Sequence, residues 1–215
     1  MEINIDTTEI QFFMKAFTIN AKKLINKLID NYNHLFQIDP QDAQVIHNEL
    51  GDALELKGNY EGAIKAYKQI LLSDLENATA LFKLGRIYIR LGLKDAALEA
   101  LKKVTILDEG NSEAFYLLGS VYFAADSYNE AWKSFTTAII LNPGYGEAYY
   151  KLGLIADAEN DHENAVHSYL KAVSLNPDSI KAYQSLGFAY EAIGMRDEAA
   201  EYFKRALDIE QNKVP

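Results

Sequence analysis

The chain has 215 residues, a formal net charge of −10 and no cysteine. The negative charge argues against a nucleic-acid-binding protein, which usually presents a basic surface. The lack of cysteine excludes disulfides, a thiol nucleophile and cysteine-ligated metals. No run approaches the roughly 18 apolar residues of a membrane span, and Gln11 and Lys15 interrupt the first apolar run, unlike the core of a signal peptide. The composition therefore favours a cytoplasmic protein.

Residues 1–43 are predicted to form a helical segment that differs from the rest of the chain. Apolar residues recur at spacings of three and four from Ile10 to Ile38, with one interruption at Asn31. One long helix, or two helices with a break near Asn20, fits this pattern. Asp39-Pro40 is expected to end the segment, because the residue before a proline is pushed out of the helical region.

The same segment is basic, whereas the chain that follows is acidic. Four lysines and no acid lie between residues 10 and 29, but residues 44–213 contain 17 basic and 25 acidic residues. A basic amphipathic helix can cap the first repeat, dock in the groove of a neighbouring chain, or lie on a membrane surface. The residues that we select as a self-assembly segment are Phe13, Phe17, Lys22, Lys23, Leu24 and Leu28.

Five Leu-Gly pairs recur at a constant interval of 34 residues, at 50–51, 84–85, 118–119, 152–153 and 186–187. This interval is the signature of the tetratricopeptide repeat, a helix-turn-helix unit that buries its apolar face by stacking on copies of itself. It predicts an all-α superhelix (α-solenoid) of five units over residues 44–213, after the extra helical segment 1–43. The expected units are 44–77, 78–111, 112–145, 146–179 and 180–213.

The turns follow the same register. Where the first helix of a unit should end, three units have a glycine and the other two have Asp126 and Asn160, which tolerate the left-handed conformation. The glycines are Gly58, Gly92 and Gly194. Pro143 and Pro177 should separate later units, because proline cannot continue a helix interior. The first two junctions have no proline and are expected to be less sharply defined.

In this repeat family the first helices line a concave groove, and positions 2, 5, 9 and 12 of each unit point into it. Here the middle of the groove is aromatic and its rim acidic, which is typical of a docking site for an amphipathic helix or an extended peptide. The alternative is that the superhelix curls enough to bury several of the aromatic rings. The candidate groove residues are Asn48, Asp52, Phe82, Arg86, Tyr116, Ser120, Phe123, Tyr150, Leu154, Gln184 and Phe188.

One known binding mode of this family does not fit the sequence. Adaptors that bind the C-terminal carboxylate of chaperones have Lys at position 5 and Asn at position 9 of one unit. This chain has Asn48 and Asp52 there, then Phe82 and Arg86 in the next unit. We therefore expect a peptide carboxylate to meet acids at this place rather than a cationic clamp.

We find no set of residues that predicts catalysis, a cofactor or a metal site. His162 and His167 are five residues apart, so they do not share a helix face, and no third ligand is suitably spaced. The many carboxylates belong to amphipathic helices, where they usually form the solvated face. No nucleophile is paired with a base, and we expect a non-enzymatic protein.

The last two units carry a narrower resemblance, in the runs EAYYKLGL at 147–154, KAYQSLGFAYE at 181–191 and RDEAAEYFKRAL at 196–207. These runs resemble the MamA family of magnetosome-associated proteins of magnetotactic bacteria, although the resemblance is weak before residue 40. It implies a non-enzymatic scaffold on the cytosolic side of the magnetosome membrane that self-assembles into large homo-oligomers and supports magnetosome formation or activation. It also implies that the N-terminal segment docks in the concave groove of a neighbouring copy.

The residues and the resemblance lead to one hypothesis and one alternative. The hypothesis is a scaffold that polymerises by placing part of residues 8–38 in the groove of the next chain. Its partners are itself and other magnetosome or membrane-associated proteins; it binds no nucleic acid, and its membrane contact is peripheral and indirect. The alternative is a monomeric adaptor that binds a peptide or helix of another protein in the same groove.

Overall fold

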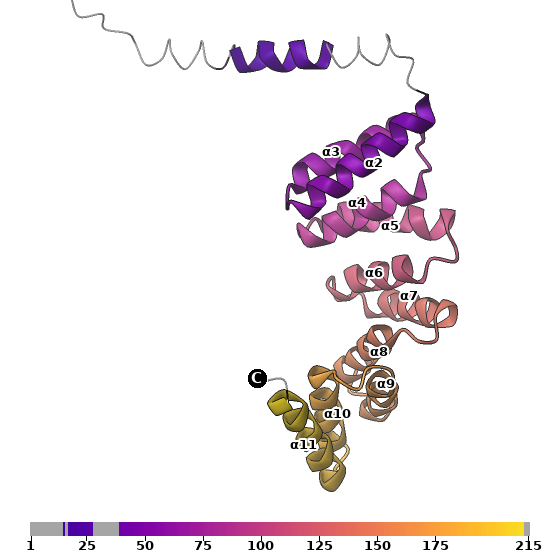
Figure 1. Cartoon of the computed structure of the whole chain (residues 1–215). Helices are drawn as coiled ribbons and strands as arrows, with labels where there is room; N and C mark the ends of the chain where they lie inside the picture. Colours follow the sequence, from indigo (N-terminus) through magenta and orange to yellow (C-terminus); the bar gives the residue numbers. More distant parts are fainter. Residues whose placement is uncertain (1–14, 16, 28–38, 213–215) are drawn as a thin grey trace, which may run out of the picture.

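Helix-turn-helix pairs stack into a curved column in the computed structural model, which describes residue 15 and residues 17–27 and 39–212 (Figure 1). This confirms the all-α prediction with its paired units. Each helix packs mainly on the helices before and after it in the chain. The helices of the column are α2 (Pro40–Leu56), α3 (Tyr60–Ser73), α4 (Ala78–Arg90), α5 (Lys94–Leu107), α6 (Ser112–Phe123), α7 (Tyr128–Leu141), α8 (Gly146–Ala158), α9 (His162–Leu175), α10 (Ile180–Ala192) and α11 (Arg196–Asn212).

The first helix of the column begins earlier than the other first helices. α4, α6, α8 and α10 each begin at the first residue of an expected unit, whereas α2 begins at Pro40, four residues before residue 44. Asp39 caps α2, because its carboxylate accepts a hydrogen bond from the Gln41 backbone N–H at 2.8 Å. Proline suits the first helical position, where its missing N–H would have no partner. Asp39-Pro40 therefore begins a helix, which the sequence analysis did not expect.

The turns inside the units confirm the left-handed positions. Gly58 has φ 73°, and Asp126 and Asn160 have φ 54° and 62°. Only glycine adopts this conformation without steric cost, although Asp and Asn tolerate it better than other residues. The same turn therefore forms in all five units with three different residue types.

The junctions between units are equally well defined with and without proline, contrary to our expectation. Asp74 ends α3 with φ −144° and ψ 90°, and Asn142 ends α7 with φ −135° and ψ 92°. The Asp74 carboxylate accepts the Glu76 backbone N–H at 3.2 Å, and Asn142 Oδ1 accepts that of Gly144 at 3.0 Å. The side chain of Asp or Asn therefore defines the junction, through the hydrogen bond that these residues make two positions ahead.

Much of the buried core lies between the second helix of one unit and the first helix of the next. The contacting residues on each helix are spaced by four and then three positions, so they form one stripe. Ala63, Tyr67 and Ile70 of α3 pack with Ala80, Leu84 and Ile87 of α4. The corresponding residues Ala165, Tyr169 and Ala172 of α9 pack with Ala182, Leu186 and Ala189 of α10.

Residues 17–27 form one continuous helix outside the column (Figure 1). The alternative of two helices with a break near Asn20 is therefore wrong for this stretch. Two residues of the self-assembly segment, Phe13 and Leu28, lie outside the described residues. Within the part of the chain that the structure covers, every helix is too short or too polar to cross a membrane.

We predict that Gly119→Ala destabilises the protein by up to about 2 kcal/mol. A Cβ atom at Gly119 would lie 2.8 Å from Phe135 Cδ1. Such overpacking costs about 1–3 kcal/mol. The better helix propensity of alanine offsets about 1 kcal/mol of this cost. The measurement is urea unfolding followed by circular dichroism. Gly110→Ala is the control, because the nearest atom there is Asp108 Oδ1 at 3.7 Å; a change there as large as at Gly119 would contradict the prediction.

Candidate protein-binding groove

Most of the expected groove aromatics are half-buried against neighbouring rings rather than fully exposed. The Tyr116 ring stacks on Tyr145 with ring centroids 4.8 Å apart and lies 5.7 Å from Phe135. Tyr150 lies 5.7 Å from Tyr169 in the same way. These contacts lie within single units, because Phe135 and Tyr145 belong to the unit of Tyr116, and Tyr169 belongs to the unit of Tyr150. The half-buried state of these rings agrees with the alternative of partial burial, and their role in binding a partner stays a prediction.

The other apolar groove residues divide between packing and exposure. Phe123 is partly buried 5.6 Å from Tyr128, and Phe82 and Leu154 are partly buried against core clusters. Phe188 is 63% exposed, although its ring meets Phe203 edge-on at 5.0 Å. The apolar surface that a partner can cover is therefore concentrated in the last unit.

The polar candidates of units 3 and 5 have different surroundings. The Ser120 hydroxyl is committed to its own helix, because it donates to the Tyr116 carbonyl oxygen at 2.9 Å. Gln184 is exposed. Of these two candidates, only Gln184 offers a free polar group to a partner.

The first two units meet in a polar cluster that the sequence analysis only partly anticipated. Lys83 Nζ lies 2.6 and 2.8 Å from the two carboxylate oxygens of Asp52 and 2.9 Å from Asn48 Oδ1. The Tyr67 hydroxyl donates to Asp52 at 2.7 Å. Burial alone would raise the pKa of Asp52, but the hydrogen bonds from Lys83 and Tyr67 outweigh it and hold that pKa below its ordinary value.

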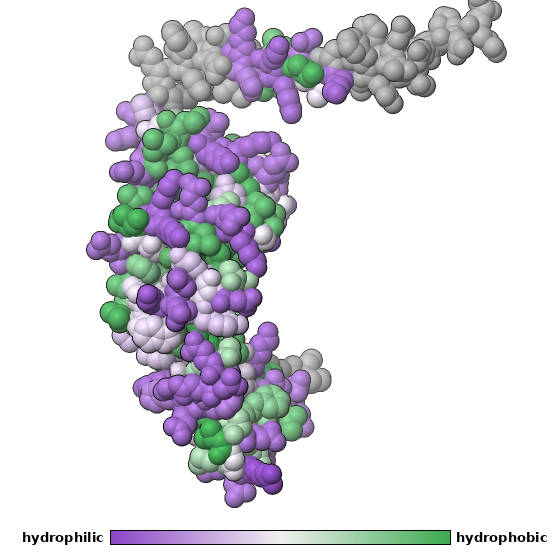
Figure 2. Space-filling model, turned by 180° about the vertical axis from the view of Figure 1, so that it is seen from behind, coloured by the Kyte–Doolittle hydropathy of each residue, from purple (hydrophilic) through white to green (hydrophobic). Residues whose placement is uncertain are grey.

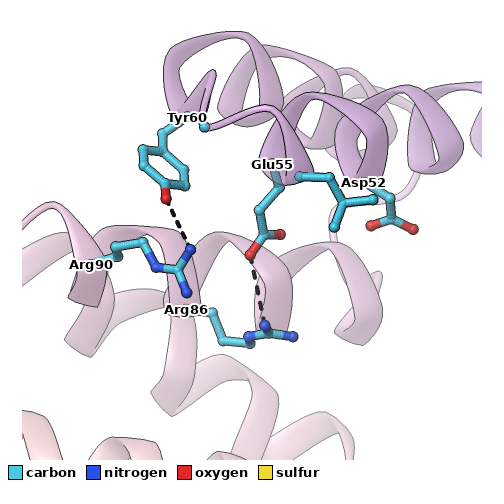
Figure 3. A pocket seen from close by; sticks show the side chains of 7 residues that line it. Asp52, Glu55, Tyr60, Arg86 and Arg90 are labelled. Carbon is cyan, nitrogen blue, oxygen red and sulfur yellow. Dashed lines mark hydrogen bonds and ion pairs between the residues drawn. The ribbon is translucent and has the colours of Figure 1, made fainter.

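A pocket of about 470 Å³ opens beside this cluster, with acids from α2 on one side and arginines from α4 on the other (Figure 3). Arg86 Nη2 lies 3.7 Å from Glu55 Oε1, which is long for an ion pair. Arg90 Nη1 lies 2.9 Å from the Tyr60 hydroxyl. Because Lys83 neutralises Asp52, both arginines can receive an anionic group. The pocket therefore places two guanidinium groups beside the acids Asp52 and Glu55, and our expectation that a peptide carboxylate meets acids rather than a cationic clamp stays a prediction.

The middle of the groove has the opposite charge. Burial and then the carboxylates of Glu113 and Glu147, together with the Tyr116 ring, raise the pKa of Tyr145 to about 12. Neither glutamate forms an ion pair with another described residue. Two uncompensated carboxylates beside a stacked tyrosine pair favour the binding of a cationic side chain.

Three residues of the groove were missing from the sequence analysis: Lys83, Tyr145 and Arg90. The buried Tyr67 did carry a signal for the polar cluster, because the second, third and fifth units have leucine or phenylalanine at its position and a buried hydroxyl needs a partner. Lys83 and Arg90 had none, since lysines and arginines on helices are usually solvated. Tyr145 occupies the N-cap of α8, where asparagine or serine stands in other units, and only the fold shows its contact with Tyr116.

The remaining candidates concern metals and self-assembly. His162 Nδ1 lies 3.1 Å from Asp157 Oδ1, and within the described residues no three potential metal ligands come together. In the helix 17–27, Phe17 is 72% and Leu24 61% exposed, and Lys22 and Lys23 are exposed as well. This helix therefore presents both an apolar and a basic face to solvent.

Comparisons with known proteins agree with this architecture. Tetratricopeptide repeat models match residues 48–114 and 136–212. A crystal structure of MamA is 46% identical over 77% of this chain and 96% of that chain, with a TM-score of 0.73. A second MamA crystal structure is 44% identical over 81% and 95%, with a TM-score of 0.74. MamA from Desulfovibrio magneticus RS-1, from residue 41 onward, is 25% identical over 81% and 98%, with a TM-score of 0.75. Among curated proteins, none matches this chain.

We predict that Asp52→Asn lowers stability at neutral pH by up to about 1 kcal/mol, as expected for a partly exposed ion pair. Since the folded-state pKa of Asp52 lies below its ordinary value of 3.8, its contribution is present above that pH and is lost as the pH falls further. The stability difference from the unmodified chain should therefore shrink below about pH 4. Urea unfolding at several pH values measures it.

Asp208→Asn is the matched control for this prediction, because Asp208 is an exposed residue in the body of α11. It makes the same chemical change without breaking an interhelical contact. A pH-independent effect of Asp52→Asn, or an equal effect at Asp208, would show that the Lys83–Asp52 contact contributes no stability.

Proposed function

Because the chain belongs to the tetratricopeptide repeat family and is similar to MamA, we propose that it is a non-enzymatic scaffold that self-assembles into homo-oligomers. Tetratricopeptide repeats bind proteins, and this chain presents a groove of the kind that receives a helix. The scaffold coats the cytosolic face of the magnetosome membrane and supports magnetosome formation or activation. It is cytoplasmic and peripheral, and it contacts other magnetosome or membrane-associated proteins.

The observation that carries this proposal is the exposed amphipathic helix at residues 17–27. Phe17, Leu24 and Ile25 are 72%, 61% and 54% exposed. A short helix gains most of its stability from packing its apolar face on another surface. The groove of a second copy offers such a surface, because it exposes Phe188 and part of several half-buried rings.

The charges of the two surfaces support the same docking. Lys22, Lys23 and Lys27 are exposed on the helix, and Glu113 and Glu147 are exposed in the groove without ion-pair partners among the described residues. A contact between the helix of one chain and the groove of the next is heterologous, so it extends into rings or open assemblies rather than stopping at a dimer. Large homo-oligomers are the expected product.

The Arg86–Arg90 pocket favours a second function, that of a monomeric adaptor. The basic helix 17–27 cannot supply the anionic group that these arginines suit. An acidic peptide of another protein can, through charge-assisted hydrogen bonds to the guanidinium groups. The two functions differ in oligomeric state, and the alternative requires no self-association.

We predict that the full-length chain forms large assemblies at tens of micromolar and that removal of residues 1–38 leaves a monomer. The deletion keeps Asp39 and with it the cap of α2, so the column itself is preserved. Size-exclusion chromatography with light scattering measures the mass of both proteins. A monomeric full-length chain would reject the scaffold and favour the adaptor. Assembly that persists after the deletion would show that residues 1–38 are not the docking segment.

We predict that Lys22→Glu with Lys23→Glu weakens assembly by about tenfold or more, and that adding Glu113→Lys with Glu147→Lys restores part of it. Each pair alone places like charges opposite one another, whereas the combination restores attraction with the signs exchanged. Sedimentation velocity over a concentration series measures the association constant. Equal weakening by the combined variant would mean that the lysines do not meet these glutamates.

A further inference from the structure

The first unit exposes an apolar surface that the later units bury, with Leu152 of the fourth unit partly buried. Positions 3, 7 and 10 of a unit pack on the preceding unit: Ala80, Leu84 and Ile87 are exposed by no more than 2%, and Ala182, Leu186 and Ala189 by no more than 1%. In the first unit the same positions are Ile46, Leu50 and Ala53 of α2, which we call the end face. Ile46 is 51% and Leu50 47% exposed, and Ala53 is exposed too. Figure 2 shows hydrophobic side chains at this end of the column.

The helix 17–27 carries a stripe that fits the end face in spacing. Phe17, Ala21 and Leu24 are separated by four and then three residues, as are Ala63, Tyr67 and Ile70, which cover the corresponding face of the second unit. Helices pack when such stripes interdigitate, and a small residue lets the two backbones approach. In the structure neither stripe is covered: Phe17, Leu24, Ile46 and Leu50 are all substantially exposed.

Charge also selects this helix as the occupant of the end face. Asp42 and Glu49 of α2 and Glu61 of α3 are exposed, whereas the helix carries exposed Lys22, Lys23 and Lys27. The pKa of Glu61 lies below its ordinary value mainly because of its hydrogen bond with Lys65, and Lys22 adds to this effect. The helix and the first unit therefore attract one another.

The last helix of another copy is a poorer partner for the end face. The stripe of α11 that corresponds to Ala63, Tyr67 and Ile70 consists of Ala199, Phe203 and Ala206. Ala199 and Ala206 are already buried at 3% and 2%, and Phe203 is partly buried beside Phe188. Stacking of α11 on Ile46 and Leu50 would therefore bury less apolar surface than docking of Phe17 and Leu24, which are 72% and 61% exposed.

We propose that the helix 17–27 packs on the end face of its own chain as a cap, and that in this closed form it is withheld from the grooves of other copies. Residues 28–38 connect the two surfaces, and a stretch of that length reaches across up to about 36 Å. A tether this short gives a local concentration in the millimolar range, so closure within the chain competes with assembly. This regulatory half of the inference rests on the proposed function; the cap itself does not.

Disulfide trapping tests the cap, because the natural chain has no cysteine. We introduce Leu24→Cys with Leu50→Cys in the full-length chain and oxidise it at about 1 μM, well below the concentration at which assembly is expected. The expected product is a disulfide within one chain, seen as faster migration on a non-reducing gel. The matched control is Asn26→Cys with Leu50→Cys, because residue 26 lies on the opposite side of the helix from the Phe17–Ala21–Leu24 stripe.

The two pairs give distinct outcomes. Efficient intrachain bonding of the first pair and little of the second supports the cap. Equal bonding of both pairs would mean that the helix only passes near the end face at random, and bonding between chains would place the helix on another copy. Either of these two results overturns the inference.

A second variant tests the competition with assembly. Leu50→Ser weakens the closed form and should lower the concentration needed for assembly by about threefold or more, because more helices are then free to dock. Leu72→Ser is the control, since Leu72 is 77% exposed on α3 and lies outside both the groove and the end face. An unchanged midpoint for Leu50→Ser would overturn the regulatory half.

Failure of the proposed function has a different signature. If no variant assembles at any concentration, self-assembly is rejected, and the disulfide pairs still decide whether the helix caps its own chain. If assembly occurs but the variant with Leu24→Cys and Leu50→Cys forms no disulfide within a chain, the scaffold stands without the cap.

Discussion

The close approach between the two helices of each unit is the constraint on which the other features of the column depend. A glycine of the first helix lies directly against a large side chain of the second: a Cβ atom at Gly85 would come within 2.8 Å of Leu101, and one at Gly119 within 2.8 Å of Phe135. The same large side chains also form the stripe on which the next unit packs: Leu101 contacts α6, and Phe135 contacts α8. The stacking angle and the curl of the groove follow from that repeated contact.

The sequence could predict the features that depend on local spacing, and it could not predict those that depend on contacts between segments far apart in the chain. The 34-residue interval located the units, and Gly58, Asp126 and Asn160 marked the left-handed turns. The stacking of Tyr116 on Tyr145 depends on the path of the turn after α7, which no residue pattern states. Lys83 was missed for the same reason, since its partners lie more than 30 residues away in the preceding unit.

The groove combines two electrostatic environments that suit different ligands. The first two units leave Arg86 and Arg90 open to an anion, while the middle units leave Glu113 and Glu147 open to a cation. A docked helix with only basic charges would therefore settle toward the middle and last units, near Phe188. The arginine pocket would remain accessible in an assembled chain, so that one molecule could join the scaffold and still hold an acidic partner.

The exposed end face also has a consequence for the lifetime of the chain. In a column where each helix packs mainly on its chain neighbours, stability is a sum over adjacent units, and a terminal unit with one neighbour opens most readily. The last unit covers its buried residues with the polar helix α11, whereas the first unit exposes Ile46 and Leu50 to water. Fraying and proteolytic attack should therefore start at α2 and α3, and whatever covers that surface sets how long the intact chain survives.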